Sequence, residues 1–135
     1  MAKKAEYQLS SSVNEGTLEI VITGEVTANT IKNVDEEIHT LLKTTESRVI
    51  LIDIRAVSGR LGTVESYFHV QNYSSEMQRA DIALVDLEEY ADLQSFYETA
   101  ASNAGMSLKY FTDIDTARNW LKRRQRLRTV DQLRG

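Results

Sequence analysis

The chain has 135 residues and a mass of 15.3 kDa, the size of one domain, and its 41% of hydrophobic residues support a core and exclude overall disorder. It contains no cysteine, which excludes disulfides, thiolate zinc sites and thiol nucleophiles. The net charge of -4, with a pI near 5.2, argues against nucleic acid as a general partner.

The amino-terminal residues and the hydropathy pattern bear on the cellular compartment. No apolar run approaches the roughly 20 residues of a membrane span. Residues 1–5, expected to be a flexible terminus, lead into polar residues and not into the apolar stretch of a signal peptide. We therefore expect a cytoplasmic protein that is not transmembrane.

The first half of the chain predicts a hairpin and a helix. Two segments with alternating apolar residues, 7–13 and 17–23, flank Asn14-Glu15-Gly16 and indicate two strands joined by a tight turn. After Gly24 the apolar period lengthens, which places one apolar stripe on a helix that begins near Ile31.

The second half alternates strands and helices. The run Val49–Ile54 is apolar at successive positions, as in a central strand covered on both faces. The further predicted elements are a loop over 56–62, a helix over 63–78, a strand over 82–85, a helix capped by Asp86 that ends near Gly105, a strand over 108–111 and a final helix. This order predicts an α/β single domain whose mixed sheet of about five strands has a starting hairpin, then right-handed parallel crossovers, with about four helices.

Most catalytic chemistry is excluded. There is no Gly-x-Ser-x-Gly elbow and no phosphate-binding glycine loop. The two histidines, His39 and His69, are 30 positions apart and form no His-x-x-x-His pair of metal ligands. We therefore expect no catalytic residue, no metal and no cofactor.

One group of residues is suited to binding. In a parallel α/β sheet, ligands bind beyond the carboxyl ends of the strands, where the central strand leads into a loop over 55–63. The candidate phosphoacceptor, anion or partner residues there are Asp53, Arg55, Ser58, Gly59, Arg60, Gly62 and Thr63. Hydroxyls, cations and a helix N-terminus would hold a phosphate on Ser58 or Thr63. In the structural alternative, Thr63 is an N-cap and Ser58 a turn residue.

The chain resembles the STAS-domain superfamily, in its SpoIIAA-like branch related to SEC14-type folds. The resemblance covers about Tyr7 to Leu121. Three parts of the sequence carry the resemblance. They are Leu18–Val26 with the capped helix after it, the central strand Val49–Ile54, and the motif Lys109–Asp113 followed by Ala117–Leu121. Anti-sigma-factor antagonists of this superfamily carry an Asp-Ser-Ser-Gly loop whose serine is phosphorylated by a partner kinase. That motif is absent from Val57–Thr63, so the resemblance implies the fold without the phosphorylation switch.

The resemblance and the residues lead to two functional hypotheses. The first is a non-enzymatic regulatory or interaction domain that binds a protein partner, a regulator or kinase, through the loop 55–63 and the following helix. The second is a carrier or sensor of a lipid or other small apolar ligand, which the similarity to lipid-carrying folds implies. Candidate pocket residues for it are Tyr67, Phe68, Tyr90, Phe96 and Tyr97, which core packing would equally explain.

The modest net charge hides an uneven distribution. Residues 1–108 hold eight Lys and Arg against 17 Asp and Glu, a net -9, whereas residues 109–135 hold eight against three, a net +5. We therefore divide the chain into a domain over 6–121 and a basic helical extension over 122–135. The charge of the extension would allow it to bind an acidic face of a neighbouring subunit, an anionic membrane surface or nucleic acid. In the structural alternative, its cations only stabilise the partial negative charge at the C-terminus of the helix. Together with an exposed edge strand near Tyr7, it favours a homo-oligomer.

Overall fold

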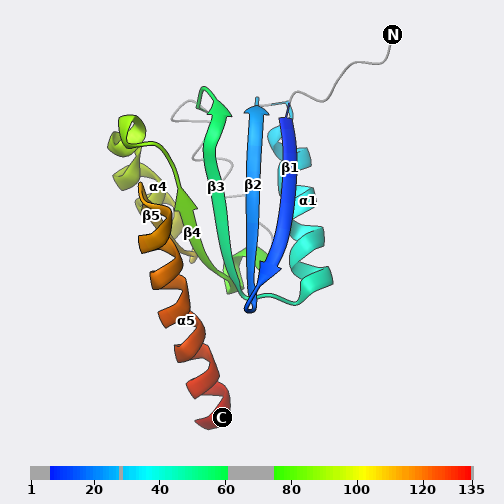
Figure 1. Ribbon diagram of the computed structural model, residues 1–135, viewed down its shortest axis with the longest axis vertical. Coiled ribbons are helices and arrows are strands. Elements are labelled where there is room, and N and C mark those ends of the chain that lie inside the picture. Colours follow the sequence, from blue (N-terminus) through cyan, green and yellow to red (C-terminus); the bar gives the residue numbers. More distant parts are fainter. Residues whose placement is uncertain (1–6, 28, 61–74, 135) are drawn as a thin grey trace.

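A computed structural model of the protein describes residues 7–27, 29–60 and 75–134, with side chains through Val130. The expected flexible residues 1–5 and most of the helix expected over 63–78 lie outside these ranges. A five-stranded sheet in the order β1-β2-β3-β4-β5 forms the centre (Figure 1). Its strands are β1 (Tyr7–Asn14), β2 (Thr17–Glu25), β3 (Val49–Ser58), β4 (Asp81–Val85) and β5 (Ser107–Phe111). Only β1 and β2 pair antiparallel, and the other neighbours are parallel, so the predicted mixed sheet is confirmed.

The first two strands form the predicted hairpin. Its turn residues, Glu15 and Gly16, both have positive φ, 53° and 85°, as a two-residue turn between twisted strands requires. The register pairs Asn14 with Thr17 across this turn. The alternating residues Leu18, Ile20 and Ile22 are buried on one face of the sheet.

Helices cover both faces of the sheet, which divides the core in two. In the described residues these are α1 (Ile31–Thr45), α3 (Ser75–Arg79), η1 (Glu88–Leu93), α4 (Gln94–Asn103) and α5 (Ile114–Arg134). Residues of α1, α3 and α4 pack with Ile50 and Ile52 of β3, whereas α5 packs on Val49 and Leu51. Because side chains alternate along a strand, β3 supplies both cores, which explains its continuous apolar run.

The central strand is longer than its apolar run. It continues past Ile54 to Ser58, because Ala56, Val57 and Ser58 pair with the end of β2 after a register shift. The first part of the loop expected over 56–62 is therefore strand. This pairing holds the carboxyl end of β3 against the end of β2.

The helix expected from Asp86 to Gly105 is wrong in its first half. The chain forms the 3-10 segment η1 and then α4, and the residue before η1 is Leu87, in extended conformation and with no side-chain cap bond. Asp86 does not cap this segment, because its carboxylate points into the protein and accepts other donors. The core residues Ala100 and Ala101 lie in α4 as the apolar period predicts.

The last helix, α5, is continuous from Ile114 to Arg134. Asp113 begins it by accepting hydrogen bonds from the amide and the hydroxyl of Thr116, at 2.8 and 2.7 Å. Its buried residues, Ala117 and Leu121, face the sheet. No helix in the described part of the chain is long and apolar enough to cross a membrane.

Candidate functional site

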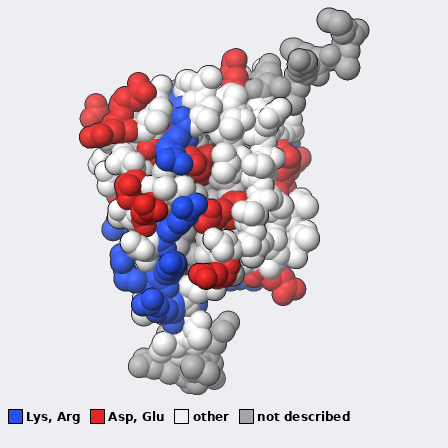
Figure 2. Space-filling view, in the orientation of Figure 1, with Lys and Arg blue, Asp and Glu red and all other residues white. Residues whose placement is uncertain are grey.

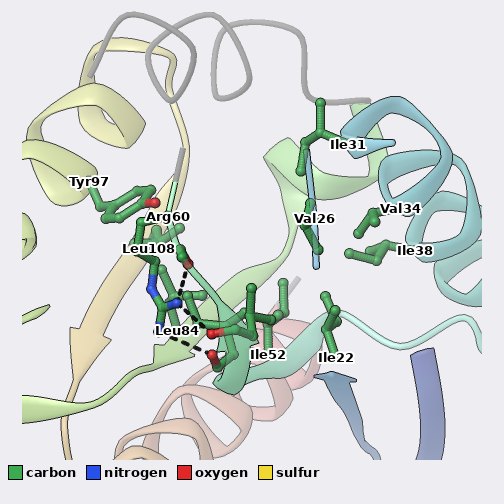
Figure 3. Close-up of a pocket in the computed structure, with 13 residues that line it drawn as sticks. Ile22, Val26, Ile31, Val34, Ile38, Ile52, Arg60, Leu84, Tyr97 and Leu108 are labelled. Atoms are coloured by element: carbon green, nitrogen blue, oxygen red, sulfur yellow. Dashed lines mark hydrogen bonds between the residues drawn. The ribbon is translucent and has the colours of Figure 1, made fainter. Parts of the chain in front are cut away.

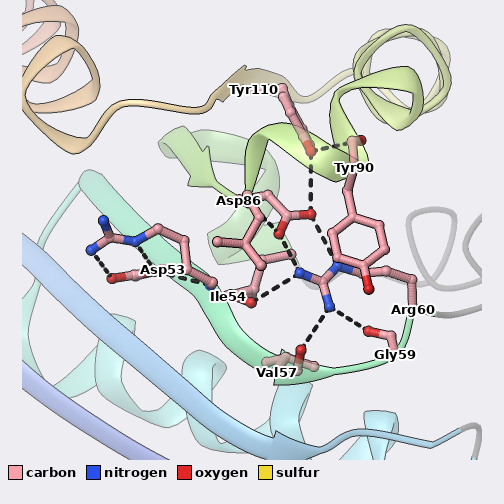
Figure 4. A network of polar contacts seen from close by, with 10 residues as sticks. Asp53, Ile54, Val57, Gly59, Arg60, Asp86, Tyr90 and Tyr110 are labelled. Atoms are coloured by element: carbon pink, nitrogen blue, oxygen red, sulfur yellow. Dashed lines mark hydrogen bonds and ion pairs between the residues drawn. The ribbon is translucent and has the colours of Figure 1, made fainter.

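A buried ion pair lies at the carboxyl edge of the sheet, between the ends of β3 and β4 (Figure 4). Asp86 directly follows β4 and is fully buried, and the Arg60 side chain, two residues beyond β3, is only 7% exposed. Two contacts join the groups: Nε of Arg60 donates to Oδ2 of Asp86 at 3.0 Å, and Nη2 donates to Oδ1. The pair is a bidentate fork, the strongest arrangement that these side chains form.

The other donors of Arg60 bind the backbone of β3 and its end. Nη1 donates to the carbonyls of Val57, at 2.8 Å, and Gly59, and Nη2 also donates to the carbonyl of Ile54, at 3.3 Å. All five N–H donors of the guanidinium therefore have acceptors inside the protein. The Tyr90 ring covers the guanidinium, with its centroid 4.0 Å from Cζ. Arg60 thus positions this edge of the sheet and has no donor left for a ligand.

Two further donors complete the shell of Asp86. The amide of Leu87 donates to Oδ1 at 2.7 Å, and the hydroxyl of Tyr110 on β5 lies 3.2 Å from Oδ2. The same hydroxyl lies 2.9 Å from the carbonyl of Tyr90. The network therefore connects the ends of β3, β4 and β5 with η1.

Burial and charge shift the pKa values in this network. Burial would lower the pKa of Arg60, but the hydrogen bond and charge of Asp86 outweigh it and hold the pKa above its ordinary value. Burial, followed by the negative charge and hydrogen bond of Asp86, raises the pKa of the Tyr110 phenol above its usual range. Both groups consequently keep their protons at every physiological pH.

Asp53 and Arg55 lie on the opposite face of the sheet from this network. Asp53 continues the alternation of Val49 and Leu51 and points to the side of α5. Its Oδ1 accepts the Arg55 amide and Nε at 3.0 Å, and its Oδ2 accepts Nη2 at 2.8 Å. Burial opposes ionisation of Asp53, but the Arg55 contacts outweigh it and lower the pKa of the carboxyl. The candidate residues predicted from the sequence therefore belong to two separate places.

The remaining candidate residues follow the strand. Ser58 is exposed and ends β3, and Gly59 is exposed with φ of 71°, in the left-handed region that glycine favours. Gly62 and Thr63 lie outside the described residues. The described part of the predicted loop thus presents one hydroxyl, that of Ser58, beside the fixed Arg60.

An apolar cavity of about 90 Å³ lies between α1 and the sheet (Figure 3). Most of its wall is aliphatic, from α1 and strands β2 to β5, and Arg60 lies at one side. The described residues that line it are Ile22, Val26, Ile31, Val34, Ile38, Ile52, Ile54, Val57, Gly59, Arg60, Leu84, Tyr97 and Leu108.

The aromatic residues expected to line a pocket have different positions. Tyr97 lines the cavity, whereas the Tyr90 ring covers Arg60. Phe96 packs edge-on against Tyr97, with 5.9 Å between the two ring centroids. Neither Tyr90 nor Phe96 is among the described residues that line this cavity. Tyr67 and Phe68 lie outside the described residues.

Sequence reasoning missed the central acid and its tyrosine partner. Asp86 was interpreted as a helix cap and Tyr110 as a strand residue. The sequence did contain one signal for Asp86, which is an acidic residue directly after a wholly buried strand. Burial of such a residue costs free energy unless hydrogen-bond or charge partners compensate it, so partners from elsewhere in the chain were to be expected. No group of three or more potential metal ligands occurs among the residues that the structure describes.

Comparison with known proteins identifies solved structures that have a similar fold. No protein-family model and no curated protein sequence matches the chain. An anti-sigma factor antagonist from Mycobacterium paratuberculosis has 14% identity and a TM-score of 0.60, and the match covers 86% of this chain and 94% of that one. An uncharacterized protein from Shewanella loihica with a SpoIIAA-like fold has 16% identity and a TM-score of 0.59, with 90% and 98% covered. The anti-sigma factor antagonist SpoIIAA in its unphosphorylated form has 15% identity and a TM-score of 0.53, with 82% and 91% covered.

These likenesses extend over nearly the whole length of each solved structure. They confirm the SpoIIAA-like fold that the sequence resemblance implied. At such identities a likeness carries the fold alone, because one fold supports many functions.

Proposed function

We propose that the protein is a non-enzymatic regulatory domain that binds a protein partner at the carboxyl edge of its sheet, through the loop 55–63 and the helix expected after it. Two of the proteins that share its fold are named anti-sigma factor antagonists. The carboxyl edge is also where open α/β sheets present their binding groups. The absence of a catalytic group in the sequence supports a binding function in place of an enzymatic one.

The observation that carries this proposal is the buried network under Ser58 and Gly59. Arg60 donates to the carbonyls of Val57 and Gly59, and Asp86 anchors Arg60 to the next strand. An exposed edge held in this way loses little conformational entropy when a partner binds it. A phosphate on Ser58 would add negative charge at the same edge and oppose an acidic partner.

The test is affinity capture from native cells with four forms of the full chain. We expect a protein that wild type retains and that Ser58→Glu loses, while Ser95→Glu, an exposed serine in the first turn of α4, retains it. Thr63→Glu is a second variant at the proposed surface. If neither Ser58→Glu nor Thr63→Glu changes the captured proteins, while both melt like wild type, the proposal fails.

The cavity between α1 and the sheet supports a second candidate, a carrier or sensor of a small apolar ligand. Its volume of about 90 Å³ is below the roughly 150 Å³ of an engineered apolar cavity that binds benzene. A lipid chain would thus require the cavity to widen, whereas a few apolar atoms fit it directly. Native mass spectrometry of the purified protein, with thermal shifts for fatty acids and for xenon, tests this candidate; the absence of bound molecules and of any shift rejects it.

A further inference from the structure

The carboxyl-terminal half of α5 has no core beneath it. The helix has 21 residues and a length of about 31 Å at 1.5 Å per residue, whereas β4 and β5 have five residues each. Among its described side chains, those that pack in the core end at Leu121. Beyond that point the helix continues past the edge of the sheet, toward the carboxyl terminus at the bottom of Figure 1.

Two arginines hold this half of the helix in place. Arg124 Nη2 lies 3.1 Å from Oδ1 of the buried Asp81, and Arg128 Nε donates to Oδ2 at 2.7 Å. Nη2 of Arg128 also donates to the carbonyl of Arg79 at 2.7 Å. The extension is therefore fixed against the amino-terminal edge of the sheet, and its other side chains have defined directions.

Three further cations of this half are exposed. Lys122, Arg123 and Arg126 form no ion pair with any residue that the structure describes. Figure 2 shows Lys and Arg gathered over the lower half of α5, while Asp and Glu are spread over the rest of the same face, some of them beside the basic side chains. Lys122 and Arg126 also line a groove whose other wall carries Glu15 and Glu19. Glu19 is already paired with Arg118, so the exposed end keeps a net positive charge.

Apolar side chains stand among these cations. Leu127 is 54% exposed and Val130 is 42% exposed, and they are two of the four large hydrophobic residues exposed in the described part of the chain. The helix positions 123, 127 and 130 follow one another at spacings of four and three, so they share one side of the helix. One side of α5 thus presents Arg123 together with both apolar groups.

We propose that the carboxyl-terminal half of α5 binds the surface of an anionic phospholipid bilayer. Anionic headgroups attract cations that lie near the bilayer surface, and the two exposed apolar side chains beside these cations add contact with the acyl boundary.

The apolar groups distinguish a bilayer from nucleic acid. Binding to the phosphate backbone of a nucleic acid is electrostatic and uses cations. Leu127 and Val130 would therefore contribute nothing to the affinity for a phosphate backbone.

The test is binding of the full-length protein to vesicles of equimolar phosphatidylcholine and phosphatidylglycerol, compared with pure phosphatidylcholine. Each cation near an anionic surface strengthens binding by roughly fivefold. We therefore expect Arg126→Glu, which reverses one charge, to weaken binding by about tenfold or more at low salt. Lys32→Glu, an equal change on exposed α1, is the matched control and keeps the wild-type affinity. Leu127→Ser weakens binding to the vesicles severalfold.

Each other outcome overturns the proposal. Equal affinity for the two vesicle types, or equal effects of Arg126→Glu and Lys32→Glu, removes the bilayer as the partner. Tighter binding to a short DNA duplex that Leu127→Ser leaves unchanged assigns the surface to nucleic acid. A dimer that Arg126→Glu dissociates, without vesicle binding, assigns it to a second copy of the chain. Melting temperatures equal to wild type show that the variants fold.

Discussion

Arg60 and Asp86, which are 26 residues apart in the chain, form a bidentate ion pair that is almost completely excluded from water. The pair joins the end of β3 to the end of β4, and Tyr110 extends it to β5 (Figure 4). Removing one partner of such a pair leaves an uncompensated buried charge, which costs far more than the intact pair contributes.

Arg60→Met is therefore expected to lower the free energy of unfolding by about 3–5 kcal/mol, measured by urea denaturation. Arg60→Met/Asp86→Leu removes both charges and is expected to recover much of this loss. Arg123→Met, at an exposed cation without an ion pair in the described residues, is the control and changes stability little. A loss for Arg60→Met no larger than that of the control contradicts a buried anchoring function for the pair.

Tyr110→Phe removes the hydroxyl that contacts Asp86 and Tyr90, and it is expected to cost about 1 kcal/mol at neutral pH. The raised pKa of Tyr110 adds a dependence on alkaline pH. The unfolded phenol ionises near pH 10, as expected for a free tyrosine, while the folded one keeps its proton, so the free energy of unfolding falls as the pH rises above about 10. Tyr110→Phe is therefore expected to reduce this fall. Identical alkaline profiles for wild type and Tyr110→Phe refute the assignment.

Asp35 on α1 predicts a dependence in the acidic range. Burial raises the pKa of its carboxyl to about 7. Between the unfolded pKa, near 4, and the folded one, the unfolded state releases the proton and the folded state retains it. The free energy of unfolding therefore falls as the pH rises from about 4 to about 7. Asp35→Asn is expected to flatten this slope in urea titrations at several pH values, while Asp115→Asn, at an exposed carboxyl, keeps it.

Asp81 predicts a local effect on α5. Burial opposes ionisation of its carboxyl, but contacts from Ser107, Arg128 and Arg124 outweigh it and lower the pKa. The stability from this group is thus present above its unfolded pKa and is lost as the pH falls through the folded one. Asp81→Asn is expected to increase hydrogen exchange in residues 122–130 at neutral pH while exchange in α1 stays unchanged. Equal protection of α5 in both proteins would show that the two arginines do not hold it.

The apolar pattern alone predicted most of the fold. Alternation in Leu18, Ile20 and Ile22 and the continuous run from Val49 determined which strands have one buried face and which have two, because side chains alternate about a strand. The order of elements then left few topologies, since parallel crossovers are right-handed. The likeness to solved SpoIIAA-like structures confirms this part.

The candidate site was predicted less well. The prediction placed Asp53, Arg55 and Arg60 in one binding site, but β3 continues to Ser58, and Asp53 pairs with Arg55 on the opposite face of the sheet from Arg60. Asp86 was assigned to a helix terminus, because a local pattern shows the donors within a few residues only. Its real partners are 26 and 24 residues away.

By itself, the sequence determined the order of elements along the chain, a central strand covered on both faces and the uneven charge, because these follow from periodicity and composition over short stretches. Only the tertiary structure decided which charges are satisfied. It buries Arg60 against Asp86, engages Arg124 and Arg128 with Asp81, and leaves Arg126 exposed. The physical reason is that desolvation and pairing depend on distances across the fold, and residues of the same type along α5 differ only in the partner that the folded chain brings to them.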